Sequence, residues 1–198
     1  MRAILTASIV TLLSLAAVAG ATGGTLDTPG AAKTLVCSAC HGAAGNSRSD
    51  TMPVIAGAAP GYFKKAIEDY ATGKRTSPEM EPYAKMVREL GADDVAAFFA
   101  AQAKQPTPIP ADAAAVARGK AASTPCAACH GANGKGDAAK LIPDITGQPP
   151  GFLKNQLLLF KTDKRSPGDE SLKALKALIK TIPDEALADL AAYYSSLR

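Results

Sequence analysis

All four cysteines and both histidines of the chain lie in two copies of one short motif, C-x-x-C-H-G. In chain order, the copies contribute Cys37, Cys40 and His41, then Cys126, Cys129 and His130. At this spacing the two thiols of a copy can add across the two vinyl groups of one haem, and the histidine can ligate the iron from the same side. The motifs therefore predict two covalently bound haem c groups, one in each half of the chain.

Other uses of paired cysteines fit the sequence less well. A thioredoxin-like dithiol needs a βαβ context, and no such pattern is present. A zinc site would need further ligands from elsewhere, or would have to join cysteines of both copies. A structural disulfide does not require a histidine at the same place twice. The repeated histidine thus favours haem attachment.

The chain opens with the pattern of a secretory signal peptide. A basic residue precedes an apolar run over 3–19, and small residues follow it. Cleavage after Ala19 and cleavage after Ala21 both fit, so the signal peptide is predicted to span 1–21. Because the apolar run breaks up into small residues, a membrane anchor is disfavoured, and no transmembrane segment is expected in the mature chain. Export together with haem attachment points to the bacterial periplasm.

Charge gives little sign of a nucleic-acid partner. The formal net charge is +4, basic and acidic residues are interspersed, and only 5% of the residues are aromatic. One stretch of the second half is locally basic, and it contains Lys161, Lys164, Arg165, Lys173, Lys176 and Lys180. Such a patch would steer an acidic partner, but a solvated helix face is the more common origin of this pattern.

The similarity between the two halves extends well beyond the motif. Matching segments are 52–57 with 142–147, 61–64 with 151–154, 74–75 with 164–165, and 95–99 with 190–194. An internal duplication explains this register. It predicts two domains, 22–105 and 111–198, joined by a proline-rich linker at 106–110.

Apolar side chains recur at helical spacing in these segments. Phe63, Ile67 and Tyr70 share one face of a predicted helix, as do Leu153 and Leu157 in the second copy. No run of β-branched residues alternates with polar ones, so the fold class is predicted to be all-α. A domain of roughly 80 residues with few large side chains has a small core. We therefore expect the haem to supply part of the apolar interior.

The chain resembles the dihaem class I cytochromes c of the cytochrome c4 type. The resemblance rests on the repeated C-x-x-C-H-G, the x-P-x-[IL]-x-G segment, the Gly-aromatic helix ending in Lys-Arg, and the final Ala-Ala-aromatic-aromatic helix. It covers about 30–198. It implies two tandem class I cytochrome domains packed against each other, with haems close enough to exchange electrons. It also implies an exported electron carrier or the haem subunit of a dehydrogenase.

The same resemblance implies a methionine as the second axial ligand of the iron. After the signal peptide the chain has only Met52, Met80 and Met86. Met52 corresponds to Ile142 of the second copy, and Met86 falls within a helix, which suggests packing roles for both. Counting back from the final helix of the first domain, the family's ligand corresponds to Met80. This would make the first haem, haem 1, His/Met ligated, a combination that raises the reduction potential.

The second domain departs from the pattern, because it has no methionine and no histidine other than His130. The same count lands on Leu175, flanked by Lys173 and Lys176, and a deprotonated lysine amine can ligate iron. The alternatives are a water molecule, an empty position that binds a small ligand, or a residue from a partner chain. The lysines also fit an amphipathic helix over 171–180, on which they would face solvent. Without methionine, this second haem, haem 2, is expected to have the lower potential.

Three functions are compatible with these features. The first is single-electron transfer between redox protein partners, without enzymatic activity of its own. The second is the haem subunit of a periplasmic dehydrogenase, such as one that oxidises sulfur compounds. The third is ligand binding or peroxidase-like chemistry at an open haem 2.

Overall fold

The computed structural model describes residues 28–198, and the predicted signal peptide lies outside them. Within this range the protein is helical and has two isolated β-bridges but no strand. None of the helices in this part of the chain has both the length and the hydropathy needed to cross a membrane. The all-α fold class is therefore confirmed.

The helices follow the order of the segments that match between the two halves of the sequence. The first half contains α1 (Ala31–Thr34), α2 (Ser38–His41), α3 (Pro60–Ala71), α4 (Glu81–Leu90) and α5 (Ala92–Ala100). The second half contains α6 (Ala113–Ala122), α7 (Thr124–His130), α8 (Pro150–Lys161), α9 (Lys173–Thr181) and α10 (Asp184–Ser196). Short 3-10 helices are η2 (Leu35–Cys37), η3 (Ala43–Gly45), η4 (Ala138–Lys140) and η5 (Glu170–Leu172).

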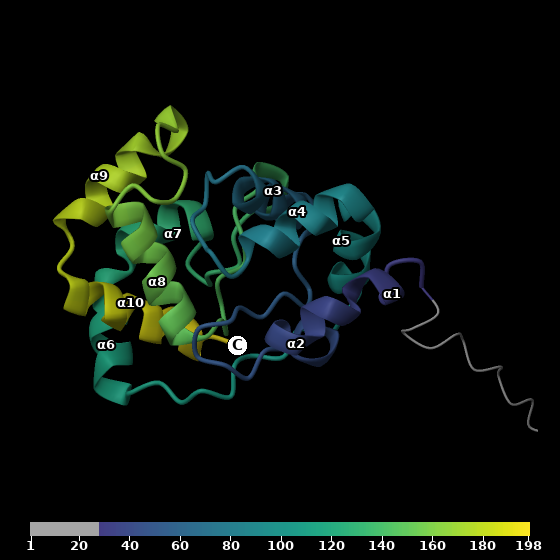
Figure 1. Ribbon diagram of the computed structural model, residues 1–198. Coiled ribbons are helices and arrows are strands. Elements are labelled where there is room, and N and C mark those ends of the chain that lie inside the picture. The colour runs from purple at the N-terminus through teal and green to yellow at the C-terminus, as the bar shows by residue number, and fades with distance from the viewer. Residues whose placement is uncertain (1–27) are drawn as a thin grey trace, which may run out of the picture.

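These helices form two groups that lie side by side (Figure 1). In the first group α3, α4 and α5 contact one another and α1 packs on α5. In the second group α10 contacts α6 and α8, and α9 packs on α8. Residues 101–112 contain no helix, and they run along the edge of the molecule from one group to the other. The fold is therefore a tandem of two small helical units.

The longest helices of the two units begin in the same way. α3 starts at Pro60 and α8 at Pro150, a position where the missing amide hydrogen of proline costs nothing. The apolar faces predicted for both helices are confirmed, because Phe63, Ile67 and Leu153 are buried. These faces pack into separate cores. The first is built around Phe63, Phe98 and Phe99, and the second around Leu153, Leu187, Leu190 and Tyr194.

In each unit the first and last helices cross at a glycine. A Cβ atom on Gly119 of α6 would lie 2.0 Å from the backbone oxygen of Asp189 in α10. At the equivalent crossing of α1 and α5, a Cβ on Gly30 would lie 2.3 Å from the backbone oxygen of Asp94. Only glycine permits so close an approach of two backbones. The position of the first helix relative to the last helix thus depends on a glycine, which has no side chain.

Backbone and amide hydrogen bonds join the two units. Gln148 accepts from the Val54 amide at 2.9 Å and donates to the Val54 carbonyl at 2.7 Å. The Phe152 amide donates to the Asp50 carbonyl at 2.9 Å. An antiparallel bridge pairs Arg75 with Arg165, which are equivalent positions of the duplication. These contacts hold the units in a fixed relative orientation.

Substituting Gly119 with alanine should destabilise the protein, because the new methyl group would collide with a backbone atom that cannot rotate away. Overpacking of this kind costs about 1–3 kcal/mol. In a chain of this size that lowers the thermal unfolding midpoint by roughly 3–10 °C, measurable by circular dichroism at 222 nm.

Gly61→Ala is the matched control. A Cβ at Gly61 would meet only the end of the flexible Leu141 side chain, at 2.9 Å. We expect a smaller change in its unfolding midpoint. Equal midpoints for the two variants would contradict the role assigned to the glycine crossing.

Candidate haem sites

Each attachment motif lies at the end of a short helical segment. Cys37 closes η2, Cys40 and His41 lie in α2, and the second motif forms the end of α7. Side chains three residues apart share one face of a helix, so the two thiols of a copy project from the same side. Gly42 and Gly131 then end the helices at φ +75° and +72°, values that favour glycine.

The imidazole rings of both motifs are held by a proline carbonyl. The Nδ1 atom of His41 is 2.9 Å from the Pro53 carbonyl oxygen, and that of His130 is 3.1 Å from the Pro143 carbonyl oxygen. Because a carbonyl oxygen only accepts, Nδ1 must carry the hydrogen, and Nε2 is left with a free lone pair. Burial lowers the pKa of both imidazoles, which keeps them neutral at pH 7. Each ring is thus prepared to ligate a metal through Nε2.

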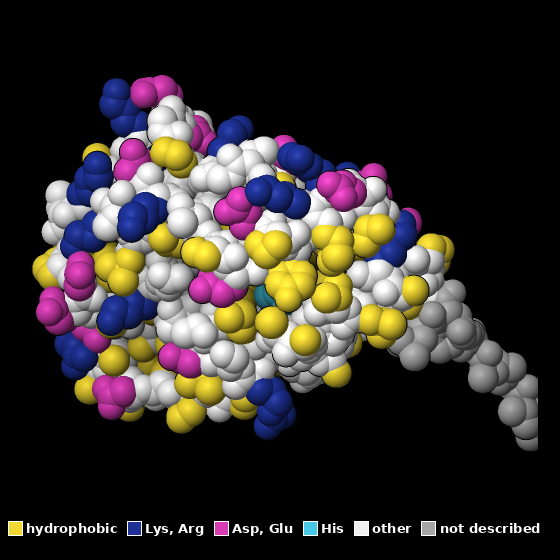
Figure 2. Space-filling model, in the orientation of Figure 1, with side chains coloured by type: hydrophobic (Ala, Val, Ile, Leu, Met, Phe, Trp, Pro, Cys, Tyr) yellow, Lys and Arg dark blue, Asp and Glu magenta, His cyan; other side chains and the backbone are white. Residues whose placement is uncertain are grey.

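The thiols fit haem attachment better than the alternatives. The four cysteines form no disulfide, and burial raises the pKa of the Cys37 and Cys126 thiols. Within residues 28–198 no three or more His, Cys, Asp or Glu side chains converge in the manner of a zinc site. Figure 2 shows one histidine in a recess bordered by hydrophobic side chains. Paired thiols beside a neutral imidazole in an apolar recess match the needs of haem c.

Met80 borders the core of the first unit. It is half-buried, caps the N-terminus of α4, and packs against the same core cluster as Cys37. The Met80 amide donates to the hydroxyl of Ser77 at 3.2 Å, which fixes the turn that leads into α4. Met52 and Met86 are also half-buried, but of the three methionines it is Met80 that shares this cluster with Cys37.

Leu172 takes the place of Met80 in the second unit. It caps the N-terminus of α9, as Met80 does in α4. The positions four and seven residues later are buried in both helices, namely Ala84 and Val87 in α4, and Lys176 and Ile179 in α9. The structure therefore aligns Leu172 with Met80.

Counting back along the sequence indicated Leu175 instead, and the structure corrects this. Leu175 is 38% exposed. The count fails because α10 has more residues before its aromatic pair, Tyr193-Tyr194, than α5 has before Phe98-Phe99. Asp184 starts α10 nine positions before Tyr193, whereas Ala92 starts α5 six positions before Phe98.

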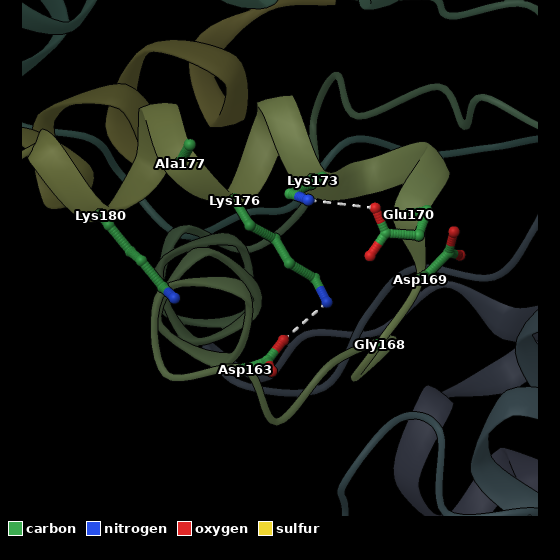
Figure 3. A pocket seen from close by; sticks show the side chains of 8 residues that line it. All are labelled: Asp163, Gly168, Asp169, Glu170, Lys173, Lys176, Ala177 and Lys180. Atoms are coloured by element: carbon green, nitrogen blue, oxygen red, sulfur yellow. Dashed lines mark hydrogen bonds and ion pairs between the residues drawn. The ribbon is translucent and has the colours of Figure 1, made fainter.

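The two candidate lysine ligands have different surroundings (Figure 3). Lys176 is only 7% exposed, so the expectation that it belongs to a solvated face is wrong. Its Nζ atom lies 2.6 Å from Asp163 Oδ1 and also donates to the carbonyl of Ser166, which compensates for the burial of the charge. The Lys173 side chain is 76% exposed, and its Nζ atom is 3.3 Å from Glu170 Oε2. Both lysines border a surface pocket of about 270 Å³.

A buried polar cluster at the junction of the units was not recognised as a site from the sequence. Arg75 is 4% exposed, and its Nε atom donates to Gln156 Oε1 at 2.9 Å. Arg165 donates to the same oxygen at 3.0 Å and to the Tyr62 hydroxyl at 3.1 Å. The guanidinium of Arg75 also stacks 4.5 Å from the ring centroid of Tyr70. The recurrence of Lys-Arg in both halves was the available signal, but sequence alone does not show that these arginines meet.

Tandem helical units, each with a C-x-x-C-H-G motif and an oriented histidine, define an all-α c-type cytochrome. The chain belongs to the cytochrome c4 family. It is 31% identical to cytochrome c4 of Pseudomonas aeruginosa over 96% of this chain and 96% of that protein. The sequence profile of the family "Cytochrome c" matches residues 116–198.

Two further similarities agree with this assignment. The chain is 30% identical to the thiosulfate dehydrogenase electron acceptor of Stutzerimonas stutzeri, over 94% of this chain and 90% of that protein. The crystal structure of reduced recombinant cytochrome c4 from Pseudomonas stutzeri has a TM-score of 0.75 at 25% identity, covering 84% of this chain and 96% of that one. The protein is therefore an electron-carrying cytochrome of the type that binds haem c covalently.

Tyr62 should ionise well below the usual range of tyrosine. Burial opposes the phenolate, but the guanidinium groups of Arg165 and Arg75 lower the pKa of Tyr62 to about 8. Tyrosine in an unfolded chain has a pKa of about 10. The stability that the phenolate contributes is therefore complete above pH about 10 and is lost as the pH falls through about 8. In a ¹³Cζ NMR titration, the Tyr62 resonance should shift near pH 8.

Comparison with Tyr62→Phe assigns this resonance, and Tyr194 serves as an internal control because burial raises its pKa. The Tyr194 resonance should not move below pH 10. A Tyr62 resonance that titrates near pH 10 would show that another anion compensates the two guanidinium charges, contrary to this prediction.

Proposed function

We propose that the chain is a periplasmic dihaem cytochrome that passes single electrons between redox protein partners. The observation that carries this proposal is the repeated site geometry, in which each motif has paired thiols and a histidine with a free Nε2 atom. Haem 1 is assigned Cys37, Cys40 and His41, and haem 2 is assigned Cys126, Cys129 and His130. Met80 is the proposed second ligand of haem 1.

The bound haem iron supplies the one-electron chemistry, and the chain supplies position and surroundings. The thiols fix the haem to the helix, and the proline carbonyls orient the imidazoles. The junction of Arg75, Arg165 and Gln156 holds the two units in one arrangement, so haems bound at the two motifs would be held at a constant separation. A fixed distance suits electron exchange between two centres, because no domain movement is needed between transfers.

The two sites are proposed to differ in reduction potential. A methionine opposite histidine raises the potential of haem iron, and Met80 is available only in the first unit. Leu172 at the equivalent place cannot donate a lone pair. An electron delivered to the protein would therefore settle on haem 1.

Processing and domain organisation belong to the same proposal. Residues 1–21 are proposed to direct export and then to be removed. Domains 22–105 and 111–198, joined by the linker 106–110, are proposed as the two haem-binding units. The helix-free segment 101–112 between α5 and α6 supports a boundary in this region.

A second candidate function is that of electron acceptor or haem subunit for a dehydrogenase of sulfur compounds. The similarity to a thiosulfate dehydrogenase electron acceptor over nearly the whole chain favours it. A free electron carrier and a dehydrogenase subunit use the same haem chemistry. They differ in whether the dehydrogenase stays bound between electron transfers. A complex with a dehydrogenase that survives purification would distinguish the subunit from a free shuttle.

A potentiometric titration of the purified protein, followed in the visible haem bands, tests the proposed function. We expect two one-electron steps at different potentials. Met80→Leu should lower the higher potential by on the order of 100 mV, since axial ligands span a range of about 0.8 V.

Met86→Leu is the matched control, because Met86 is a half-buried methionine of the adjoining helix. It should leave both potentials where they are in the wild type. Two potentials unchanged by Met80→Leu would rule out Met80 as a ligand, and a protein without reversible one-electron steps would rule out the proposed function.

A further inference from the structure

We propose that haem 2 keeps an exchangeable coordination position opposite His130, and that a neutral diatomic molecule such as carbon monoxide binds there. This inference rests on the proposed function, because it requires a haem at Cys126 and Cys129. It adds a small-ligand site to a protein whose other role is electron transfer.

The turn that presents Met80 recurs at Leu172 with a side chain that cannot ligate. The Met80 amide donates to the Ser77 carbonyl at 3.1 Å, and the Leu172 amide donates to the Asp169 carbonyl at 3.1 Å. Each residue is half-buried and caps the helix that follows. The position that supplies a thioether in one unit therefore supplies only a hydrocarbon in the other.

The second unit has no other methionine or histidine to replace that thioether. Between positions 106 and 198 the sequence contains no methionine, and His130 is its single histidine. Its two cysteines are assigned to haem attachment. The nitrogen donors nearest to Leu172 in the sequence are the amines of Lys173 and Lys176.

The amine of Lys176 is already engaged in hydrogen bonds. This amine bonds the Asp163 carboxylate (Figure 3). It also donates to the carbonyl of Ser166, and both partners lie in the loop before α9. Asp163 and Ser166 have φ values of +57° and +51°, which residues other than glycine adopt only when other contacts hold them. Moving the amine to iron would leave the carbonyl of the buried Ser166 without this donor and the carboxylate without its cation. Lys176 therefore acts as a clamp on this loop.

Lys173 is poorly placed for a different reason. Its side chain is largely in solvent, and its amine forms a long ion pair with Glu170 one turn earlier in the chain. An exposed ion pair of this kind contributes little energy, so it does not hold the lysine in place. Ligation would instead require the side chain to leave solvent and lose its proton.

The polarity and charge of the side chains at this position determine which class of ligand it can bind. Leu172 offers no hydrogen-bond donor and no charge, and the charge of Lys176 is already paired with Asp163. A distal side of this kind disfavours anions, which need a donor or a cation when they lose water. Carbon monoxide is neutral and binds ferrous iron without a hydrogen bond. The position is therefore suited to neutral diatomic molecules.

The test is titration of the purified holoprotein with carbon monoxide after reduction with dithionite, followed in the Soret band. We expect one equivalent per chain in the wild type, none in Leu172→Met, and two in Met80→Leu. The EPR spectrum of the oxidised wild type should contain one high-spin haem, which Leu172→Met converts to low spin.

Lys173→Arg and Lys176→Arg decide between an open position and a lysine ligand. Arginine keeps the positive charge but does not deprotonate, so it cannot ligate iron. Unchanged carbon monoxide uptake and spin state in both variants support the proposal. A wild type with two low-spin haems, one of which becomes high-spin in either variant, overturns it.

The number of haems per chain in the same sample distinguishes a failure of the open position from a failure of the proposed function. Two haems per chain with no uptake of carbon monoxide by the wild type overturn the open position and leave the proposed function standing. A chain that carries no haem at its second motif overturns both.

Discussion

The hydrogen bond from each motif histidine to a proline carbonyl links the attachment helix to the rest of its unit. It fixes the tautomer and the direction of the ring, so the lone pair on Nε2 points to one defined place. The loop that carries the proline is itself tied to the last helix, through Gly57 and Phe99 in the first unit at 2.8 Å, and Gly147 and Tyr194 in the second at 3.0 Å. At the glycine crossings the last helix packs against the first helix. In each unit the attachment helix, the proline loop and the last helix are therefore all linked to one another through direct contacts.

The two units agree on this side of their sites and differ on the other. The bond from the histidine to the proline carbonyl, and the bond from the proline loop to the last helix, are the same in both units. After α8, Ser166 adopts a left-handed backbone conformation that its counterpart Thr76 does not adopt, and Lys176 bonds its carbonyl as well as Asp163. The same loop reaches the first unit through Arg165. The region that distinguishes the two distal sides is therefore also part of the junction between the units.

Sequence alone predicted the fold class correctly, and the attachment residues stay a prediction from the motif; both depend on local patterns. Helical spacing and the fixed C-x-x-C-H-G motif need no knowledge of distant contacts. Leu172 could not be identified as the counterpart of Met80, because the additional turn at the start of α10 shifts any count made along the chain. The burial of Lys176 was missed because its partners lie in an irregular loop. The meeting of arginines from the two halves depends on how the units pack.

Every functional statement about this chain requires that a porphyrin be bound through thioether bonds to both pairs of thiols. The intact mass of the mature protein, made in cells that attach haem to exported chains, tests this most directly. We expect a mass equal to the polypeptide plus two haems, with the colour retained in the protein after extraction with acidified acetone. A polypeptide of unmodified mass, or one carrying a single haem, would contradict it.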